Sequence, residues 1–91
     1  MKKYIIEREI PGVDKLGSGE LAGAAKTSNA ALAQLAPRVQ WVQSYVAKDK
    51  TFCVYLAESE DAIRDHARIS GFPANKITEI TGMIDPVTAR G

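Results

Sequence analysis

The fold of this chain is decided by the stretch from Val39 to Leu56, which reads VQWVQSYVAKDKTFCVYL. Two runs rich in β-branched and aromatic residues, 39–47 and 51–57, flank the charged triplet Lys48-Asp49-Lys50. This pattern is typical of two antiparallel strands joined by a short loop. We therefore predict a β-hairpin with a loop of three residues, 48–50.

Alternation of side chains divides the hairpin into two rows, because neighbouring residues of a strand point to opposite faces of the sheet. A three-residue loop pairs Val46 with Phe52 and keeps the aliphatic side chains together. A two-residue loop would pair Tyr45 with Phe52 and mix the rows, so we reject it. The aliphatic row, which we expect to face the helices, is Val42, Val46, Phe52, Val54 and Leu56. The row that we expect on the open face is Trp41, Gln43, Tyr45, Cys53 and Tyr55.

The flanking sequence predicts the remaining elements. We expect a strand over 3–9, a helix from Ser18 to just before Pro37, a helix from Ser59 to Gly71, and a strand from Lys76 to Ile84. The order is β-α-β-β-α-β, that of the ferredoxin-like fold. We predict an α+β fold in which a four-stranded antiparallel sheet carries both helices on one face, formed by residues 1–91 as a single domain.

Composition excludes several classes of protein. A net charge of +1 in 91 residues argues against nucleic-acid binding, which needs a basic excess on one face. No apolar run is long enough for a membrane span, and charged residues interrupt the N-terminal apolar stretch too early for a signal peptide. The single cysteine, Cys53, has no internal disulfide partner. We therefore expect a cytoplasmic protein that contacts neither nucleic acid nor membrane.

The open face of the predicted sheet is the expected interaction surface. An aromatic face on so small a chain would be an exposed apolar patch, and such patches mark binding surfaces. We expect a homodimer through this face. The residues expected to line a ligand cleft there are Trp41, Gln43, Tyr45 and Tyr55, with Lys50 near the hairpin tip. The alternative is that these side chains only pack the dimer.

Two side chains are candidate metal ligands. Cys53 would bind as a thiolate and His66 as a neutral imidazole. The alternatives are an inert buried cysteine and an ordinary helical histidine. One cysteine and one histidine are too few for a closed tetrahedral site. The carboxylates that could add to them are Glu7, Asp49 and Asp85. No HExxH, CxxC, P-loop or GxGxxG motif occurs, and no catalytic residue is identified.

The chain resembles the domain-of-unknown-function family 4242. The segments that carry this resemblance are Tyr4-Ile5-Ile6-Glu7-Arg8, the hairpin from Trp41 to Tyr55, His66-Ala67-Arg68, Gly71-Phe72-Pro73 and Ile84-Asp85-Pro86. The resemblance implies a ferredoxin-like dimer and nickel binding, with Cys53 and His66 matching the family pattern. Many relatives have a histidine where this chain has Gln43, which removes one imidazole ligand.

Three functions follow as hypotheses. The first is a small dimeric ligand-binding protein that takes a transition metal, nickel above all, through Cys53 and His66. The second is an enzyme of the dimeric α/β-barrel type that acts on a small aromatic or carbonyl compound in the open-face cleft. The third is a structural interaction domain without a ligand. Neither the physiological metal nor a substrate follows from the sequence.

Overall fold

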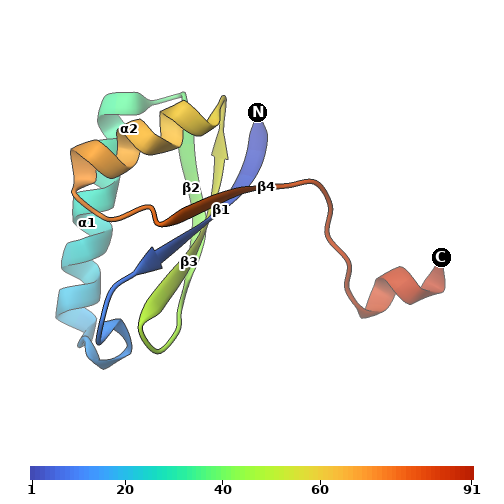
Figure 1. Ribbon diagram of the computed structural model, residues 1–91, viewed down its shortest axis with the longest axis horizontal. Coiled ribbons are helices and arrows are strands. Elements are labelled where there is room, and N and C mark those ends of the chain that lie inside the picture. Colours follow the sequence, from blue (N-terminus) through green and yellow to red (C-terminus); the bar gives the residue numbers. More distant parts are fainter.

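The computed structural model describes residues 1–91 and confirms the ferredoxin-like fold. The strands are β1 Lys2–Glu9, β2 Val39–Val46, β3 Lys50–Ala57 and β4 Lys76–Ile80; the α-helices are α1 Ser18–Leu35 and α2 Glu60–Ser70; short 3-10 turns span Val13–Lys15 and Pro86–Arg90. The sheet is antiparallel, in the order β2-β3-β1-β4. Both helices lie on one of its faces (Figure 1). None of the helices is long and apolar enough to cross a membrane.

The helix ends follow the local sequence. The Ser59 hydroxyl accepts the backbone N–H of Ala62, so it caps the first turn of α2. At the other end of α2, Gly71 has φ of 80°, a left-handed conformation that glycine adopts without strain. Helix α1 ends at Leu35, ahead of Pro37. These predicted boundaries are confirmed.

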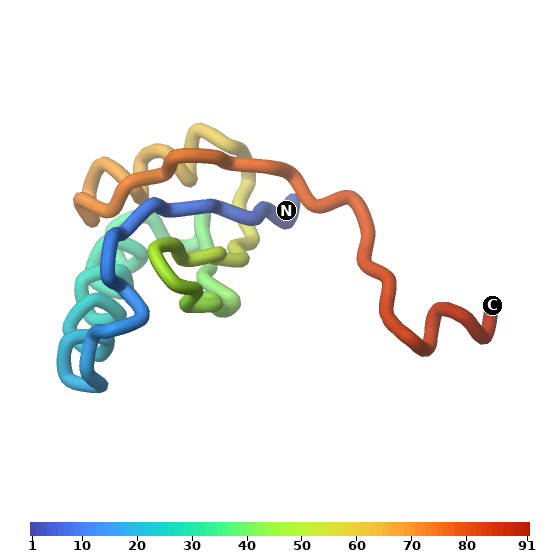
Figure 2. The backbone as a smooth tube through the Cα atoms, turned by 60° about the horizontal axis from the view of Figure 1, so that its bottom comes forward, coloured from blue at the N-terminus to red at the C-terminus, as the bar shows by residue number.

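The last strand is shorter than predicted. β4 ends at Ile80 rather than at Ile84, because its neighbour β1 begins at Lys2, and the final backbone pair joins Lys3 to Ile80. Residues beyond this pair have no strand to bond with. The segment 81–91 therefore leaves the sheet and extends away from it (Figure 2). The side chain of Ile84 is 85% exposed there.

The predicted register of the hairpin is wrong. The structure pairs Tyr45 with Phe52 and Val46 with Thr51, so the loop has two residues, 48 and 49. The backbone N–H of Ala47 donates to the carbonyl of Lys50 over 2.9 Å and closes this tight turn. The ladder is also irregular on β2, where Trp41 pairs with Tyr55 and Gln43 with Val54. One extra residue, Val42, forms a β-bulge and reverses the alternation of side chains at that point.

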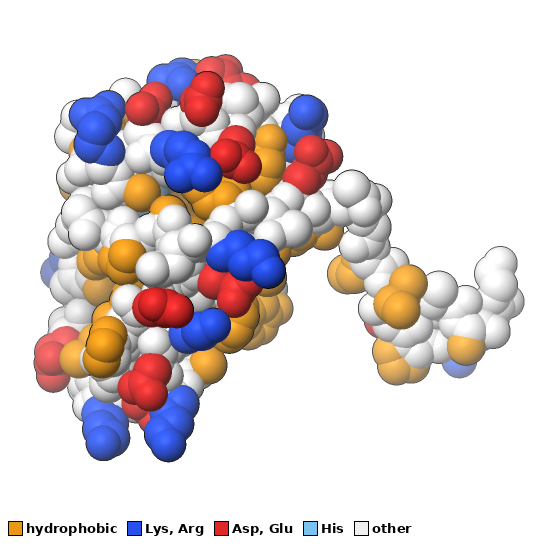
Figure 3. All heavy atoms as spheres, viewed as in Figure 1, with side chains coloured by type: hydrophobic (Ala, Val, Ile, Leu, Met, Phe, Trp, Pro, Cys, Tyr) orange, Lys and Arg blue, Asp and Glu red, His pale blue; other side chains and the backbone are white.

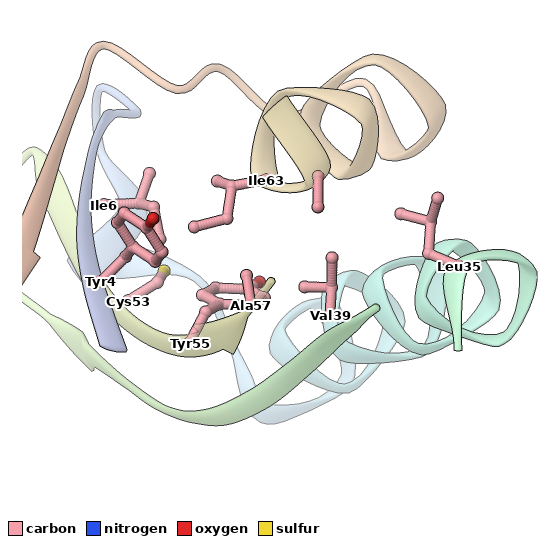
Figure 4. Close-up of a cluster of buried hydrophobic side chains, with 9 residues drawn as sticks. Tyr4, Ile6, Leu35, Val39, Cys53, Tyr55, Ala57 and Ile63 are labelled. Atoms are coloured by element: carbon pink, nitrogen blue, oxygen red, sulfur yellow. The ribbon is translucent and has the colours of Figure 1, made fainter. Parts of the chain in front are cut away.

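This register gives β3 the opposite orientation to the predicted one. Its buried, helix-facing side chains are Thr51, Cys53, Tyr55 and Ala57. The apolar side chains of Phe52, Val54 and Leu56 lie half-buried on the open face. Cys53 and Tyr55 instead join the main core cluster, whose members are Tyr4, Ile6, Leu35, Val39, Cys53, Tyr55, Ala57, Ala62 and Ile63 (Figure 4). The small side chains of Ala57 and Ala62, both fully buried, allow close packing of α2 on the sheet.

The face of the molecule drawn in Figure 3 carries both signs of charge. On the face shown in Figure 3, basic and acidic side chains lie interspersed, without a large patch of one sign. Several of these groups form exposed ion pairs, such as Arg38 with Glu58 and Arg64 with Glu60. Exposed pairs of this kind contribute about 0–1 kcal/mol each. The stability of the fold therefore rests mainly on the core rather than on these exposed pairs.

Candidate functional site

A cavity of about 370 Å³ lies between the first half of α1 and the helix-facing side of the sheet. The residues that line it are Arg8, Ile10, Val13, Leu16, Leu21, Ala24, Ala25, Ser28, Trp41, Ser44, Val46, Thr51, Cys53, Tyr55, Phe72 and Pro73. Its existence follows from the small side chains of α1. Ala24 and Ala25 face the sheet without filling the space, whereas Ala31 and Leu35, further along the helix, are buried in contact with the rest of the protein.

The segment that joins β1 to α1 forms part of the cavity wall. This segment contributes Ile10, Val13 and Leu16 to the lining. Asp49 at the hairpin tip holds it in place, because its side chain accepts the backbone N–H of Gly12 over 2.9 Å and its carbonyl accepts the N–H of Ile10. Gly12 has φ of 75°, which makes glycine favourable at that turn. The cavity wall is thus tied to the hairpin.

Arg8 is the only charged residue among those that line the cavity. Its side chain is almost completely buried, with an exposed fraction of 2%. Nη1 donates to the carbonyl oxygen of Pro73 over 2.7 Å, while Nη2 is buried without a hydrogen-bond partner. The neighbouring Glu7 pairs with Lys50 over 3.4 Å and takes no part in balancing Arg8. No carboxylate lies within ion-pairing distance of Arg8, so its charge is uncompensated within this chain.

A chain of buried polar groups lies beside this arginine. The Tyr55 hydroxyl is 3.5 Å from the Ser28 hydroxyl, which in turn is 3.1 Å from Nε2 of His66. The rings of Tyr55 and His66 are in contact, with centroids 5.2 Å apart. Nδ1 of His66 is buried and has no partner. These hydrogen-bonded groups fix the Tyr55 side chain in the wall of the cavity.

Burial keeps both titratable groups of this hydrogen-bonded set, Tyr55 and His66, neutral. Desolvation raises the pKa of Tyr55 above its ordinary value, so the phenol keeps its proton at neutral pH. Desolvation also lowers the pKa of His66, and the positive charge of Arg8 lowers it further, so the imidazole is neutral. The guanidinium of Arg8 is then the one formal charge at the cavity wall.

The five residues predicted to line one ligand cleft are divided among three places. Trp41 and Tyr55 line the cavity on the helix side. Gln43 and Tyr45 line a separate hollow of about 210 Å³ on the open face, together with residues of the C-terminal segment such as Met83. Lys50 lines neither and pairs with Glu7. The hairpin register separates Tyr55 from Gln43 and Tyr45, and the β-bulge moves Trp41 to the same side as Tyr55.

The two predicted metal ligands lie on the helix side of the sheet. Cys53 lines the cavity, and its thiol contacts the hydroxyl of Thr51 at 3.5 Å. His66 is fully buried behind Ser28 and does not line the cavity. The chain contains no group of three or more His, Cys, Asp or Glu side chains placed to hold a metal ion. A single subunit therefore does not supply a nickel site with a full set of protein ligands.

Arg8 and Ser28 are the residues that the sequence analysis missed. Arg8 follows Tyr4 and Ile6 at intervals of two, and all three are buried on the same side of β1. An arginine in phase with buried strand residues was a readable signal of an internal charge. The hydrogen-bond partners of Ser28 come from α2 and β3, which sequence alone did not identify.

Comparison with known proteins gives one family and one structural relative. The family described as nickel responsive protein SCO4226-like matches residues 4–80. The crystal structure of SCO4226 from Streptomyces coelicolor A3(2) superposes with a TM-score of 0.73 at 20% identity, covering 90% of this chain and 99% of that one. At this identity the superposition supports the fold alone. No curated protein matches the chain.

Proposed function

The chain belongs to the SCO4226-like family of nickel-responsive proteins, and on this premise we propose that it is a cytoplasmic, homodimeric protein that binds a small ligand in the cavity beneath α1. The cavity carries the proposal. Ligand sites in proteins are concave, mostly apolar, about 300–1,000 Å³ in volume and provided with a few polar groups. The space beneath α1 has these properties, with a buried arginine and the hydroxyls of Ser28 and Tyr55 as its polar groups.

The open face of the sheet supports the proposed dimer. Its centre is the apolar row of β3 formed by Phe52, Val54 and Leu56. Beside this row, Val42 and Tyr45 are 50% and 56% exposed. In the segment that leaves the sheet, Met83 and Ile84 are 79% and 85% exposed. A second copy placed on this face would cover such a surface. Sedimentation analysis should give twice the chain mass, and Val54→Glu should yield a monomer. A wild-type protein that sediments as a monomer contradicts the dimer.

Nickel is a second candidate ligand because of the family to which the chain belongs. Cys53 and His66 are chemically suitable donors for it. They would need additional ligands from outside the subunit's own donor set, and the proposed open-face partner does not reach them, because both lie buried on the helix side of the sheet. Calorimetric titration of tag-free protein with nickel tests this. Binding that Cys53→Ala weakens supports it, whereas wild-type protein that binds no nickel removes the candidate.

The cavity itself is tested by occupying it. Trp41, the only tryptophan, lines the space, so its fluorescence should change when octanol, a neutral apolar probe, is titrated in. Ala25→Phe places a phenyl ring in the cavity and should abolish this response. Ala33→Phe is the matched control, since Ala33 is exposed on the same helix. If Ala25→Phe and wild type respond alike, the probe binds elsewhere and the cavity is not the site.

A further inference from the structure

We propose that the ligand of this cavity is an apolar monocarboxylate whose carboxylate group pairs with Arg8. This inference rests on the proposed function, because it names the class of ligand that the cavity takes. It draws on the charge of the cavity, the chemistry of its remaining lining and the number of its cations.

The buried charge of Arg8 is unbalanced within this chain. Buried charges in proteins are paired or fully hydrogen-bonded, since removing them from water is strongly unfavourable. Arg8 is 98% buried (exposed fraction 2%), has a buried Nη2 without a partner and has no carboxylate in reach. Tyr55 cannot serve as its counterion, because burial raises the pKa of the phenol. The fold thus leaves a guanidinium at the cavity wall with the capacity to hold an anion.

The rest of the cavity lining determines the polarity of the ligand that fits it. Apart from Arg8, all lining side chains are apolar or neutral, and several are large, including Trp41 and Phe72. The indole N–H of Trp41 is already engaged, since it donates to the Ser44 hydroxyl over 3.0 Å. A ligand in this space must therefore be apolar over most of its surface. Its polar end is recognised by Arg8.

The single cation of the cavity determines the sign and size of the charge that a ligand can carry there. Guanidinium binds carboxylate in a planar, two-pronged geometry, and the pair is stronger in a water-poor site. A single cation balances a monoanion but not a phosphate dianion. The same positive charge opposes a free metal cation in this space. A carboxylate on an apolar body satisfies the charge, the shape and the polarity of the cavity together.

The test compares octanoate with octanol, which share the apolar chain and differ in the charged group. Calorimetry on wild-type protein should show octanoate binding at least ~10-fold more tightly than octanol, the magnitude expected for one charged hydrogen-bonded contact. Arg8→Met should weaken the binding of octanoate by a similar factor and leave the affinity for octanol unchanged. Arg38→Met, which removes an exposed arginine paired with Glu58, should alter neither.

The outcomes separate this inference from the function on which it rests. If neither probe binds to wild-type protein, the cavity is not a ligand site and both fail. If both bind with equal affinity and Ala25→Phe abolishes both, the cavity stands and the carboxylate is overturned. If Arg8→Met does not fold, the ratio of octanoate to octanol affinity in wild type decides, because it needs no variant. Unchanged octanoate affinity in a folded Arg8→Met protein also overturns the inference.

Discussion

The guanidinium of Arg8 lies over the ring of Tyr55, with 5.9 Å between Cζ and the ring centroid. The two residues come from the neighbouring strands β1 and β3 and share the helix-facing side of the sheet. Such a contact contributes about 0.5–2 kcal/mol, depending on how dry it is. The ring therefore offsets part of the cost of burying the cation but does not neutralise it. The remaining imbalance is what gives the cavity its selectivity in our account.

Replacing Arg8 by methionine should leave the ligand-free protein folded and about as stable as wild type. The change loses the hydrogen bond to the carbonyl of Pro73, but it also removes a buried charge, and the substitution of buried charges by apolar side chains is often neutral or stabilising. Urea denaturation should show a free energy of unfolding within about 1 kcal/mol of wild type. A loss of several kcal/mol would show instead that Arg8 is held for the fold.

The free energy of unfolding should decrease as the pH is lowered, because His66 titrates. Because its pKa is lower in the folded protein than the unfolded value of about 6.5, the unfolded chain takes up the proton first. The contribution of neutral His66 is complete above about pH 6.5 and is lost as the pH falls toward the folded pKa, at a rate of at most ~1.4 kcal/mol per pH unit.

Thermal or urea unfolding between about pH 5.5 and 8 measures this effect, since most carboxylates titrate below that range. His66→Gln supplies the matched control, because glutamine does not titrate. The variant should lose the pH dependence that the wild type shows. Parallel profiles for the two proteins would mean that His66 is not the group responsible.

Removal of the Ser28 hydroxyl should destabilise the protein. In Ser28→Ala the Nε2 atom of His66 and the hydroxyl of Tyr55 both lose their hydrogen-bond partner in the interior. A buried polar group left unpaired costs about 1–3 kcal/mol. Ser18→Ala, at an exposed position in the first turn of the same helix, should change stability by less than about 0.5 kcal/mol. Equal effects of the two substitutions would show that the buried hydrogen bonds of Ser28 do not stabilise the protein.

The thiol of Cys53 should react slowly with a water-soluble disulfide reagent at every protein concentration. Its protection comes from α1, α2 and the sheet of its own chain, since it is 5% exposed on the helix side. In a Cys53→Ala background, Tyr45→Cys places a thiol on the open face. That thiol should react faster on dilution, as the proposed dimer separates. If the Cys53 thiol also becomes more reactive on dilution, the dimer contact protects it, and its assignment to the helix side is contradicted.

The order of elements and their ends could be predicted because they depend on residues close in sequence. Pro37, Ser59 and Gly71 act within one turn of the chain, and each ended or began a helix as expected. The early end of β4 could not be seen in this way. It is set by the start of β1, which is more than seventy residues away in sequence.

The faces of the hairpin were predicted wrongly for a physical reason. We placed the most aliphatic row against the helices, yet the structure puts Cys53 and Tyr55 there and leaves Val54 on the open face. A polar tyrosine can be buried when its hydroxyl has a partner, as Ser28 provides. The bulge at Val42 then moved Trp41 and Gln43 to opposite faces. Neither the bulge nor the partner of Tyr55 is encoded in the alternation of the strands.

Three of the residues singled out in the hairpin, Trp41, Tyr55 and Cys53, line the cavity, although on the other side of the sheet from the one predicted. The part that escaped prediction was assembled from distant segments: Arg8 on β1, the small side chains of α1 and the carbonyl of Pro73. A cavity arises where side chains fail to fill space between elements, and a single sequence does not state those distances.

The most direct test of the ligand cavity is a map of amide and indole chemical shifts during titration with octanoate. The indole N–H of Trp41 gives a single signal, because the chain has one tryptophan. Our account predicts that this signal moves, together with the amides of Ser28, Ser44 and Tyr55 around the cavity. Shifts confined to Gln43, Tyr45 and Gly82 would place the ligand in the open-face hollow and contradict the account.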